Sequence, residues 1–207
     1  MDYLNYDKGD ITKSNKTLKG VDIPEDTSLK DVANILYATP FWHFGKELPP
    51  NAHEWALWYK EQYECVQVSN RGGYQSPSRP WQEFEFKDHI SSMLSNFKEF
   101  KNFYITNWWL NVNGKGNGNN KHVHSGVDLS AVWYITDNEG LLVFEDPLVF
   151  SRLAITHQIF GSTTLQQVKA HAGDLLIFPS DLPHQVEDHE LDTPRISVSF
   201  NISLGGD

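Results

Sequence analysis

The feature that most constrains the fold is a series of short β-rich segments in the second half of the chain. Valine, isoleucine and aromatic residues favour strands, and the glycine, asparagine, proline and aspartate between them favour turns. Residues 195–202 alternate between polar and apolar side chains, so one face of this strand should lie in a core and the other in a cavity or solvent. Many short strands at close spacing predict a sandwich or barrel. The expected strands are residues 103–112, 129–135, 141–144, 174–178 and 196–202.

The chain before these strands is expected to be mainly helical. Asn51 is predicted to cap a first helix. In a second helix, apolar residues recur at spacings of three and four, which places them on one face. These residues are Phe86, Ile90, Met93, Leu94, Phe97 and Phe100. We therefore predict a polar N-terminal arm at residues 1–35 and a single domain at 36–207, in which residues 36–102 give helical support to a β-barrel core at 103–203.

Composition excludes several classes of partner. The chain carries a formal net charge of −10, which argues against a generally basic nucleic-acid-binding surface. No stretch approaches the ~20 apolar residues of a membrane helix, and the first residues do not resemble a secretory signal. Cys65 is the single cysteine, so no internal disulfide can form and a cytoplasmic location is expected. We expect no nucleic-acid or membrane partner, and the sequence is compatible with a homodimer.

Three of the nine histidines are candidates for a metal site. In an extended strand, residues i and i+2 project from the same face, so His122 and His124 can reach one point in space. His184 follows a predicted strand that ends in a proline-bounded turn, and such a turn can direct the side chain back across a barrel mouth. Neutral imidazole is a suitable ligand for Fe, Zn, Cu and Ni. The sequence therefore predicts a metal site formed by His122, His124 and His184.

Arg195 lies eleven residues after His184 and starts the alternating strand. A guanidinium that points into a barrel can hold a carboxylate through two parallel N–H donors. Ser197 lies on the same face of the strand and can donate a third hydrogen bond. We therefore predict that Arg195 and Ser197 bind an acidic co-substrate.

These residues resemble the motif of the 2-oxoglutarate and Fe(II)-dependent dioxygenases, which is His-x-Asp/Glu, a distant His, and then Arg-x-Ser. The chain is more closely similar to a branch of that superfamily found in bacteria and tailed phages, with a prolyl-hydroxylase-like fold. The resemblance covers roughly residues 36–203. The shared motifs read Ser69 to Ser76, His122 to Tyr134, Phe144-Glu145-Asp146-Pro147 and Arg195 to Asn201. The resemblance implies a mainly β fold with flanking helices (α+β), a double-stranded β-helix of the jelly-roll or cupin-like kind.

The resemblance also implies roles for single residues. His122 and His184 would bind iron, and Arg195 with Ser197 would hold the distal carboxylate of 2-oxoglutarate. Tyr134 and Asn113 fall at positions that contact the co-substrate in members of the superfamily. The sequence departs from the motif at the second ligand, where His124 stands in place of a carboxylate.

This departure leaves the second metal ligand open. If His124 is not a ligand, Asp128 or Asp146 would supply an oxygen, and His124 would orient its neighbour instead.

The function expected from the resemblance is that of an oxidoreductase using Fe(II), 2-oxoglutarate and O2. Such an enzyme couples oxidative decarboxylation of 2-oxoglutarate to succinate with oxidation of a C–H bond, by default hydroxylation. The primary substrate would be a small molecule or a peptidyl residue. The alternatives are a cupin-type metal-binding barrel (an isomerase, another dioxygenase or a binding module) that does not use 2-oxoglutarate, and a phage structural protein with a vestigial barrel.

Overall fold

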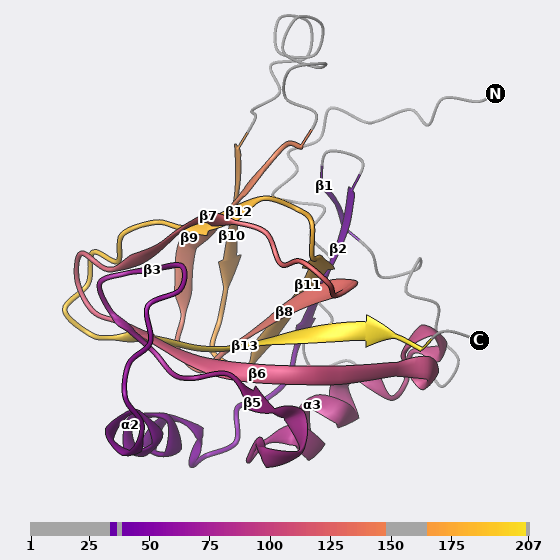
Figure 1. The fold of residues 1–207 in the computed structure, drawn as a ribbon, viewed down its shortest axis with the longest axis horizontal. Helices are drawn as coiled ribbons and strands as arrows, with labels where there is room; N and C mark the ends of the chain where they lie inside the picture. Colours follow the sequence, from indigo (N-terminus) through magenta and orange to yellow (C-terminus); the bar gives the residue numbers. More distant parts are fainter. Residues whose placement is uncertain (1–33, 37–38, 148–164, 206–207) are drawn as a thin grey trace, which may run out of the picture.

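Two antiparallel sheets face each other in the computed structural model, which describes residues 34–36, 39–147 and 165–205 (Figure 1). Within these residues the larger sheet has the strand order β1-β2-β11-β8-β13-β6-β4, with β5 paired to β6. The smaller sheet has the order β10-β9-β12-β7-β3. Most neighbours in both sheets are not consecutive in sequence, as in a jelly roll, and the predicted fold class is confirmed.

The two longest strands belong to the larger sheet. Its members are β1 (Asn34–Leu36), β2 (Thr39–Gly45), β4 (Tyr74–Gln75), β5 (Arg79–Pro80), β6 (Phe103–Asn113), β8 (Leu129–Tyr134), β11 (Asp174–Pro179) and β13 (Arg195–Leu204). The smaller sheet contains β3 (Asn70–Arg71), β7 (Gly118–His122), β9 (Asn138–Glu145), β10 (Leu165–Ala170) and β12 (His184–Val186). The helical segments are α2 (Ala52–Gln62), α3 (Lys87–Leu94) and the 3-10 turns η2 (Trp81–Glu83) and η3 (Lys98–Asn102).

The outer face of the larger sheet is apolar and is covered by the helices (Figure 1). On β13 the outward side chains are fully buried: Ile196, Val198, Phe200 and Ile202. Trp108 of β6 has its ring centroid 5.8 Å from Trp55 of α2 and 4.9 Å from Phe84. Truncation of such a buried aromatic residue costs about 3–5 kcal/mol of folding free energy, so this layer holds the helices on the sheet.

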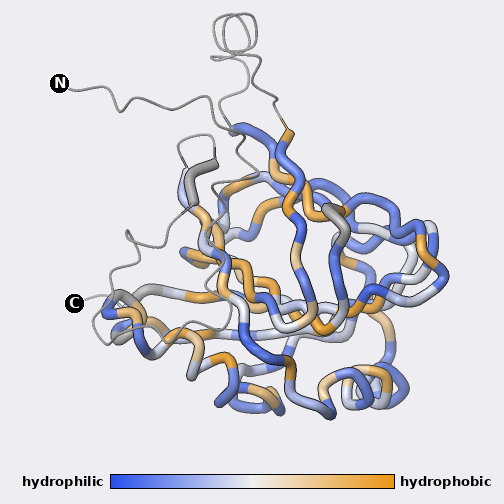
Figure 2. Tube along the Cα trace, turned by 180° about the vertical axis from the view of Figure 1, so that it is seen from behind, coloured by the Kyte–Doolittle hydropathy of each residue, from blue (hydrophilic) through white to orange (hydrophobic). Residues whose placement is uncertain are grey.

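The inner faces of the two sheets enclose a smaller apolar cluster and a polar region. The cluster includes Leu142, Phe144, Leu176 and Phe178. Figure 2 shows apolar residues along the central strands and mainly polar residues in the loops at the edge of the molecule. No helix among the described residues is long and apolar enough to cross a membrane.

Five predicted strands are confirmed, but the helical support predicted for residues 36–102 is only partly helical. Residues 39–45 form β2, which pairs with β11 inside the larger sheet. Helix α3 ends at Leu94, so the last two aromatic residues of the predicted helical stripe, Phe97 and Phe100, lie beyond it. They still pack against the same core.

One further prediction needs correction, and the predicted N-terminal arm is not tested. Asn51 occupies the N-cap position of α2, but its side chain makes no capping hydrogen bond. The predicted polar arm at residues 1–35 lies outside the described residues up to residue 33, and its last two residues belong to β1. We retain residues 36–207 as a proposed domain.

Candidate metal centre and ligand pocket

The structure brings the three predicted histidines together at one end of the smaller sheet. His122 ends β7 and His184 starts β12, and the two are direct cross-strand partners. His124 lies just past β7, where its backbone N–H donates to the carbonyl of Ser180 at 2.8 Å. One nitrogen from each of the three rings lies within 4.8 Å of the others. These distances allow all three imidazoles to bind a single ion.

The ring orientation of each histidine is fixed by a hydrogen bond to Nδ1. In His122, Nδ1 lies 2.6 Å from the carbonyl oxygen of Asn120. In His184, Nδ1 lies 2.8 Å from the carbonyl oxygen of Leu182. A carbonyl oxygen can only accept, so both Nδ1 atoms must donate and the lone pair of each ring lies on Nε2. The rings are thus held as Nε2 ligands.

The third ring is oriented by side chains instead of backbone. His124 Nδ1 lies 2.8 Å from Asn201 Oδ1 and 2.8 Å from Ser130 Oγ. Because an amide oxygen only accepts, His124 is expected to carry its proton on Nδ1 as well.

Burial keeps the imidazoles neutral. Desolvation, together with the neighbouring imidazoles of His122 and His124, lowers the pKa of His184 to about 3. Desolvation also lowers the pKa of His122 and the pKa of His124. Neutral imidazole is the form that binds metal, so at neutral pH no proton has to leave these rings before an ion binds.

Four rows of cross-strand partners lie on the inner face of the larger sheet, and most of their residues line the pocket. The first row is Asn107, Asn201 and Ser130, and the second is Trp109, Ser199 and Val132. The third row is Asn111, Ser197 and Tyr134, and the fourth is Asn113 and Arg195. The first row therefore lies beneath His124, while the predicted co-substrate residues fall in the third and fourth rows.

Arg195 is a buried cation without a complete set of partners. The residue is 4% exposed, and its Nη1 has no hydrogen-bond partner within the described part of the chain. Desolvation lowers the pKa of the guanidinium. A buried guanidinium with a free donor is costly unless an anion binds it, so the arrangement fits a negatively charged ligand.

One hollow of about 510 Å³, measured out to its open mouth, contains most of the predicted site residues. His122, His124, His184, Tyr134, Arg195 and Ser197 all line it. Trp109, with its ring centroid 5.6 Å from that of His124, lines it beside the histidines. The apolar part of the wall consists of Ala131, Val132, Leu142, Phe178 and Val186. A histidine cluster, a buried cation and an apolar wall therefore line the same hollow.

Three predicted residues lie elsewhere. Asn113 does not line the hollow; it is buried, and its Nδ2 donates to Asn119 Oδ1 at 3.4 Å. Neither Asp128 nor Asp146 belongs to the group of potential metal ligands found in the described residues. That group contains no carboxylate, so the geometry favours His124 over both alternatives.

Other residues of the site were not predicted. Asn201, Ser130, Trp109, Asn111 and Ser199 contact His124 or line the hollow. A signal for some of them was present, because the asparagines at 107, 111 and 113 fall on one face of a strand, as the polar residues along 195–201 do.

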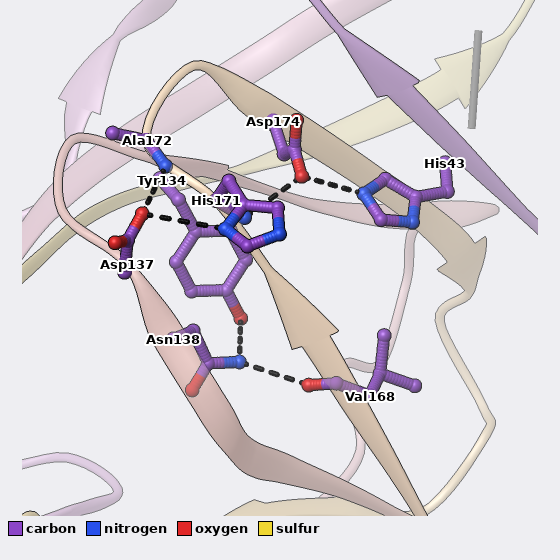
Figure 3. Close-up of polar contacts among 8 residues, drawn as sticks. All are labelled: His43, Tyr134, Asp137, Asn138, Val168, His171, Ala172 and Asp174. Atoms are coloured by element: carbon purple, nitrogen blue, oxygen red, sulfur yellow. Dashed lines mark hydrogen bonds and ion pairs between the residues drawn. The ribbon is translucent and has the colours of Figure 1, made fainter. Parts of the chain in front are cut away.

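The hydroxyl of Tyr134 is held by a hydrogen bond from the side chain of Asn138 (Figure 3). Asn138 Nδ2 donates to the Tyr134 hydroxyl at 3.3 Å and to the carbonyl of Val168 at 3.1 Å. Burial raises the pKa of Tyr134, so its phenol stays protonated. The hydroxyl proton of Tyr134 is therefore available to an acceptor in the hollow.

The same region contains a buried pair that ties β2 to β11. His43 Nε2 lies 2.9 Å from Asp174 Oδ2, which also accepts from the backbone N–H of His171 at 2.8 Å (Figure 3). These contacts fix the strand that precedes the turn to His184.

The barrel holds a potential metal centre beside a buried cation, and the comparisons with known proteins indicate the class to which such a site belongs. Residues 107–201 match the family model described as "Putative 2OG-Fe(II) oxygenase". The match covers slightly less than half of the chain and includes all three histidines and Arg195, and the predicted resemblance to this superfamily is confirmed. The class is that of 2-oxoglutarate-dependent oxidoreductases, with Fe(II), 2-oxoglutarate and O2 as the reactive components. No curated protein matches the chain in sequence.

Solved structures with the same fold have little sequence identity to the chain. HygX from Streptomyces hygroscopicus, solved with nickel and 2-oxoglutarate, is similar with a TM-score of 0.56 and 13% identity, covering 80% of this chain and 83% of that one. A prolyl hydroxylase from Trichoplax adhaerens, in complex with a hypoxia inducible factor peptide, has a TM-score of 0.55 and 14% identity, covering 79% and 83%. A Pseudomonas putida prolyl-4-hydroxylase has a TM-score of 0.50 and 15% identity, covering 81% and 94%.

Proposed function

We propose that this oxygenase is a hydroxylase in which His122, His124 and His184 hold Fe(II) through Nε2. In the same hollow, Arg195 would hold the distal carboxylate of 2-oxoglutarate. The observation that carries the proposal is the buried Arg195 Nη1, which has no hydrogen-bond partner among the described residues. HygX, which has the same fold, was solved with a metal and 2-oxoglutarate bound.

Three residues of the third and fourth rows have a defined task in this proposal. Arg195 would donate two parallel N–H bonds to one carboxylate. Tyr134, whose hydroxyl already accepts from Asn138, would donate its proton to the same group. Ser197 would add a donor from the neighbouring position. Asn113 has less support because it does not line the hollow.

The three neutral imidazoles give the proposed centre an unusual charge. A carboxylate ligand would reduce the net charge of Fe(II) from +2 to +1, whereas His124 leaves it at +2. With Arg195 the pocket carries +3, which a 2-oxoglutarate dianion reduces to +1. The additional positive charge favours binding of the dianion in a site of low dielectric constant.

The apolar wall and the mouth would serve the primary substrate. Leu142, Phe178 and Val186 limit water on one side of the hollow. Trp109 is half-buried beside His124, so the substrate would approach the metal across its ring. When bound, the iron and 2-oxoglutarate together with O2 supply the oxidising chemistry. The primary substrate is a small molecule or a peptidyl residue, and relatives of this fold were solved with hygromycin B and with a peptide.

Several finer predictions remain part of the proposal. The single exposed cysteine, Cys65, is consistent with a cytoplasmic protein, in the host cytoplasm if the chain is viral. A homodimer and a bacterial or phage origin also stay predictions.

Anaerobic titration with Fe(II) and then 2-oxoglutarate tests the proposal, because the complex has a visible charge-transfer band. We expect His184→Ala to lose metal binding and succinate formation. His171→Ala, which removes an exposed histidine outside the cluster, is the matched control and should retain both. Normal iron binding by His184→Ala would exclude His184 as a ligand. Iron binding by the unaltered protein without 2-oxoglutarate binding would support the cupin alternative instead.

A further inference from the structure

The row of residues beneath His124 is a continuous polar chain across three strands. Asn107 of β6, Asn201 of β13 and Ser130 of β8 are direct cross-strand partners. Side chains of cross-strand partners lie on the same face, close enough to interact. We refer to Asn107, Asn201 and Ser130 as the His124 row.

The hydrogen bonds in the His124 row have a defined direction. Asn107 Nδ2 donates to Ser78 Oγ at 2.6 Å, so Asn107 Oδ1 points the other way. That oxygen accepts from Thr106 Oγ1 at 2.7 Å and from Asn201 Nδ2 at 3.0 Å. The amide of Asn201 is thereby fixed, with Nδ2 toward Asn107 and Oδ1 toward His124.

The orientation of Asn201 determines what His124 can do. Asn201 Oδ1 lies 2.8 Å from His124 Nδ1 and can only accept, so it holds the proton on Nδ1 and the lone pair on Nε2. Ser130 Oγ lies at the same distance but can either donate or accept, so it does not select a tautomer. Asn201 is therefore the residue of the row that determines the state of the ring.

We infer that Asn201 is the positioning residue that makes His124 a metal ligand in place of a carboxylate. The inference rests on the proposed function and deepens it. Backbone carbonyls orient His122 and His184, but His124 lies past the end of β7 and receives its acceptor from a side chain. Partners of this kind affect metal affinity by about 10–100-fold.

The choice of an amide has a consequence for charge. A carboxylate at position 201 would also accept from Nδ1 and would make the imidazole a stronger ligand. It would also add a negative charge next to the metal and offset the positive charge that favours a dianionic co-substrate. The amide thus orients the ring without changing the charge of the pocket.

The experiment compares Asn201→Leu and Asn201→Asp with the unaltered protein. Co²⁺ alone is the probe, measured by its visible spectrum and affinity, followed by 2-oxoglutarate on the Co²⁺ protein. We expect Asn201→Leu to bind Co²⁺ about 10-fold more weakly or worse, with an altered spectrum. We expect Asn201→Asp to bind Co²⁺ more tightly but 2-oxoglutarate more weakly. Asn107 can turn its amide over to donate to the new carboxylate.

Ser203→Ala, a buried change in the same strand, is the control and should leave both affinities unchanged. Co²⁺ affinity and spectrum unchanged in Asn201→Leu would overturn the inference. If Asn201→Leu does not fold, Asn201→Asp decides alone: unchanged or weaker Co²⁺ binding would overturn it. Failure of the proposed function is distinct, because the unaltered protein would then bind no Co²⁺ or would bind it equally well in His122→Ala.

Discussion

Arg195→Met provides a quantitative test, because the substitution should weaken co-substrate binding without weakening the fold. Two charge-assisted hydrogen bonds contribute about 1.5–3 kcal/mol each. Ser197 and Tyr134 would keep part of the interaction, so we expect a loss of about 3–5 kcal/mol, or roughly 100- to 5000-fold in Kd. The assay is anaerobic 2-oxoglutarate titration of the Fe(II) protein, followed by the visible charge-transfer band.

The stability of the same variant should change in the opposite direction. Desolvation lowers the pKa of Arg195, which means that burial of the charge costs folding free energy in the ligand-free protein. Methionine has a similar length and no charge, so Arg195→Met should be neutral or should raise the free energy of unfolding by up to about 3 kcal/mol. Thermal unfolding without metal or 2-oxoglutarate measures this change.

Arg79→Met is the matched control. The Arg79 guanidinium lies 4.7 Å from the ring centroid of Tyr63, and neither residue lines the hollow. This variant should lose about 1 kcal/mol of stability and keep its 2-oxoglutarate affinity. An Arg195→Met protein that binds 2-oxoglutarate within about threefold of the unaltered protein, a difference of roughly 0.6 kcal/mol, would refute the assignment of the carboxylate clamp.

Two further predictions concern Tyr134 and His89. Tyr134→Phe should weaken 2-oxoglutarate binding by about 1–2 kcal/mol with metal affinity unchanged, and equal affinity in the same titration would remove the phenol from the site. Burial lowers the pKa of His89 to about 4, so below pH 6.5 the unfolded chain takes up this proton first and stability falls as the pH falls toward 4. His89→Gln should reduce that loss of stability by about 1–2 kcal/mol. The measurement is the free energy of urea unfolding at pH 7 and at pH 4.5. If the difference between these two free energies is the same in His89→Gln as in the unaltered protein, the lowered pKa of His89 is contradicted.

The parts of the fold that could be predicted depend on local pattern. The alternation along 195–202 predicted both the strand and its polar inner face, because the period of two is a property of the strand itself. β2 was missed because it is stabilised by pairing with β11, which is far away in sequence. β7 has the sequence Gly-Asn-Asn-Lys-His, which lacks strand-forming residues, and it is a strand because β3 and β12 pair with it on both sides.

The same distinction applies to the site. The main site residues could be predicted because their types and spacing are typical of metal ligands and of a carboxylate-binding arginine. They are His122, His124, His184 and Arg195. Asn201 could not be assigned a role from sequence, because its position under His124 depends on the register of β13 against β8. Register is set by the whole set of paired strands and by the side chains they bury. Residues that act through a neighbour are therefore the ones that sequence reasoning misses.

The three histidines come from the smaller sheet and the segment after it, whereas Arg195 starts the last strand of the larger sheet. A metal ion and a diacid bound between them would act as a cross-link between the two halves of the barrel. Ligands that bind only the folded protein stabilise it in proportion to the logarithm of their concentration over Kd. The melting temperature should therefore rise more with both ligands present than with either one alone.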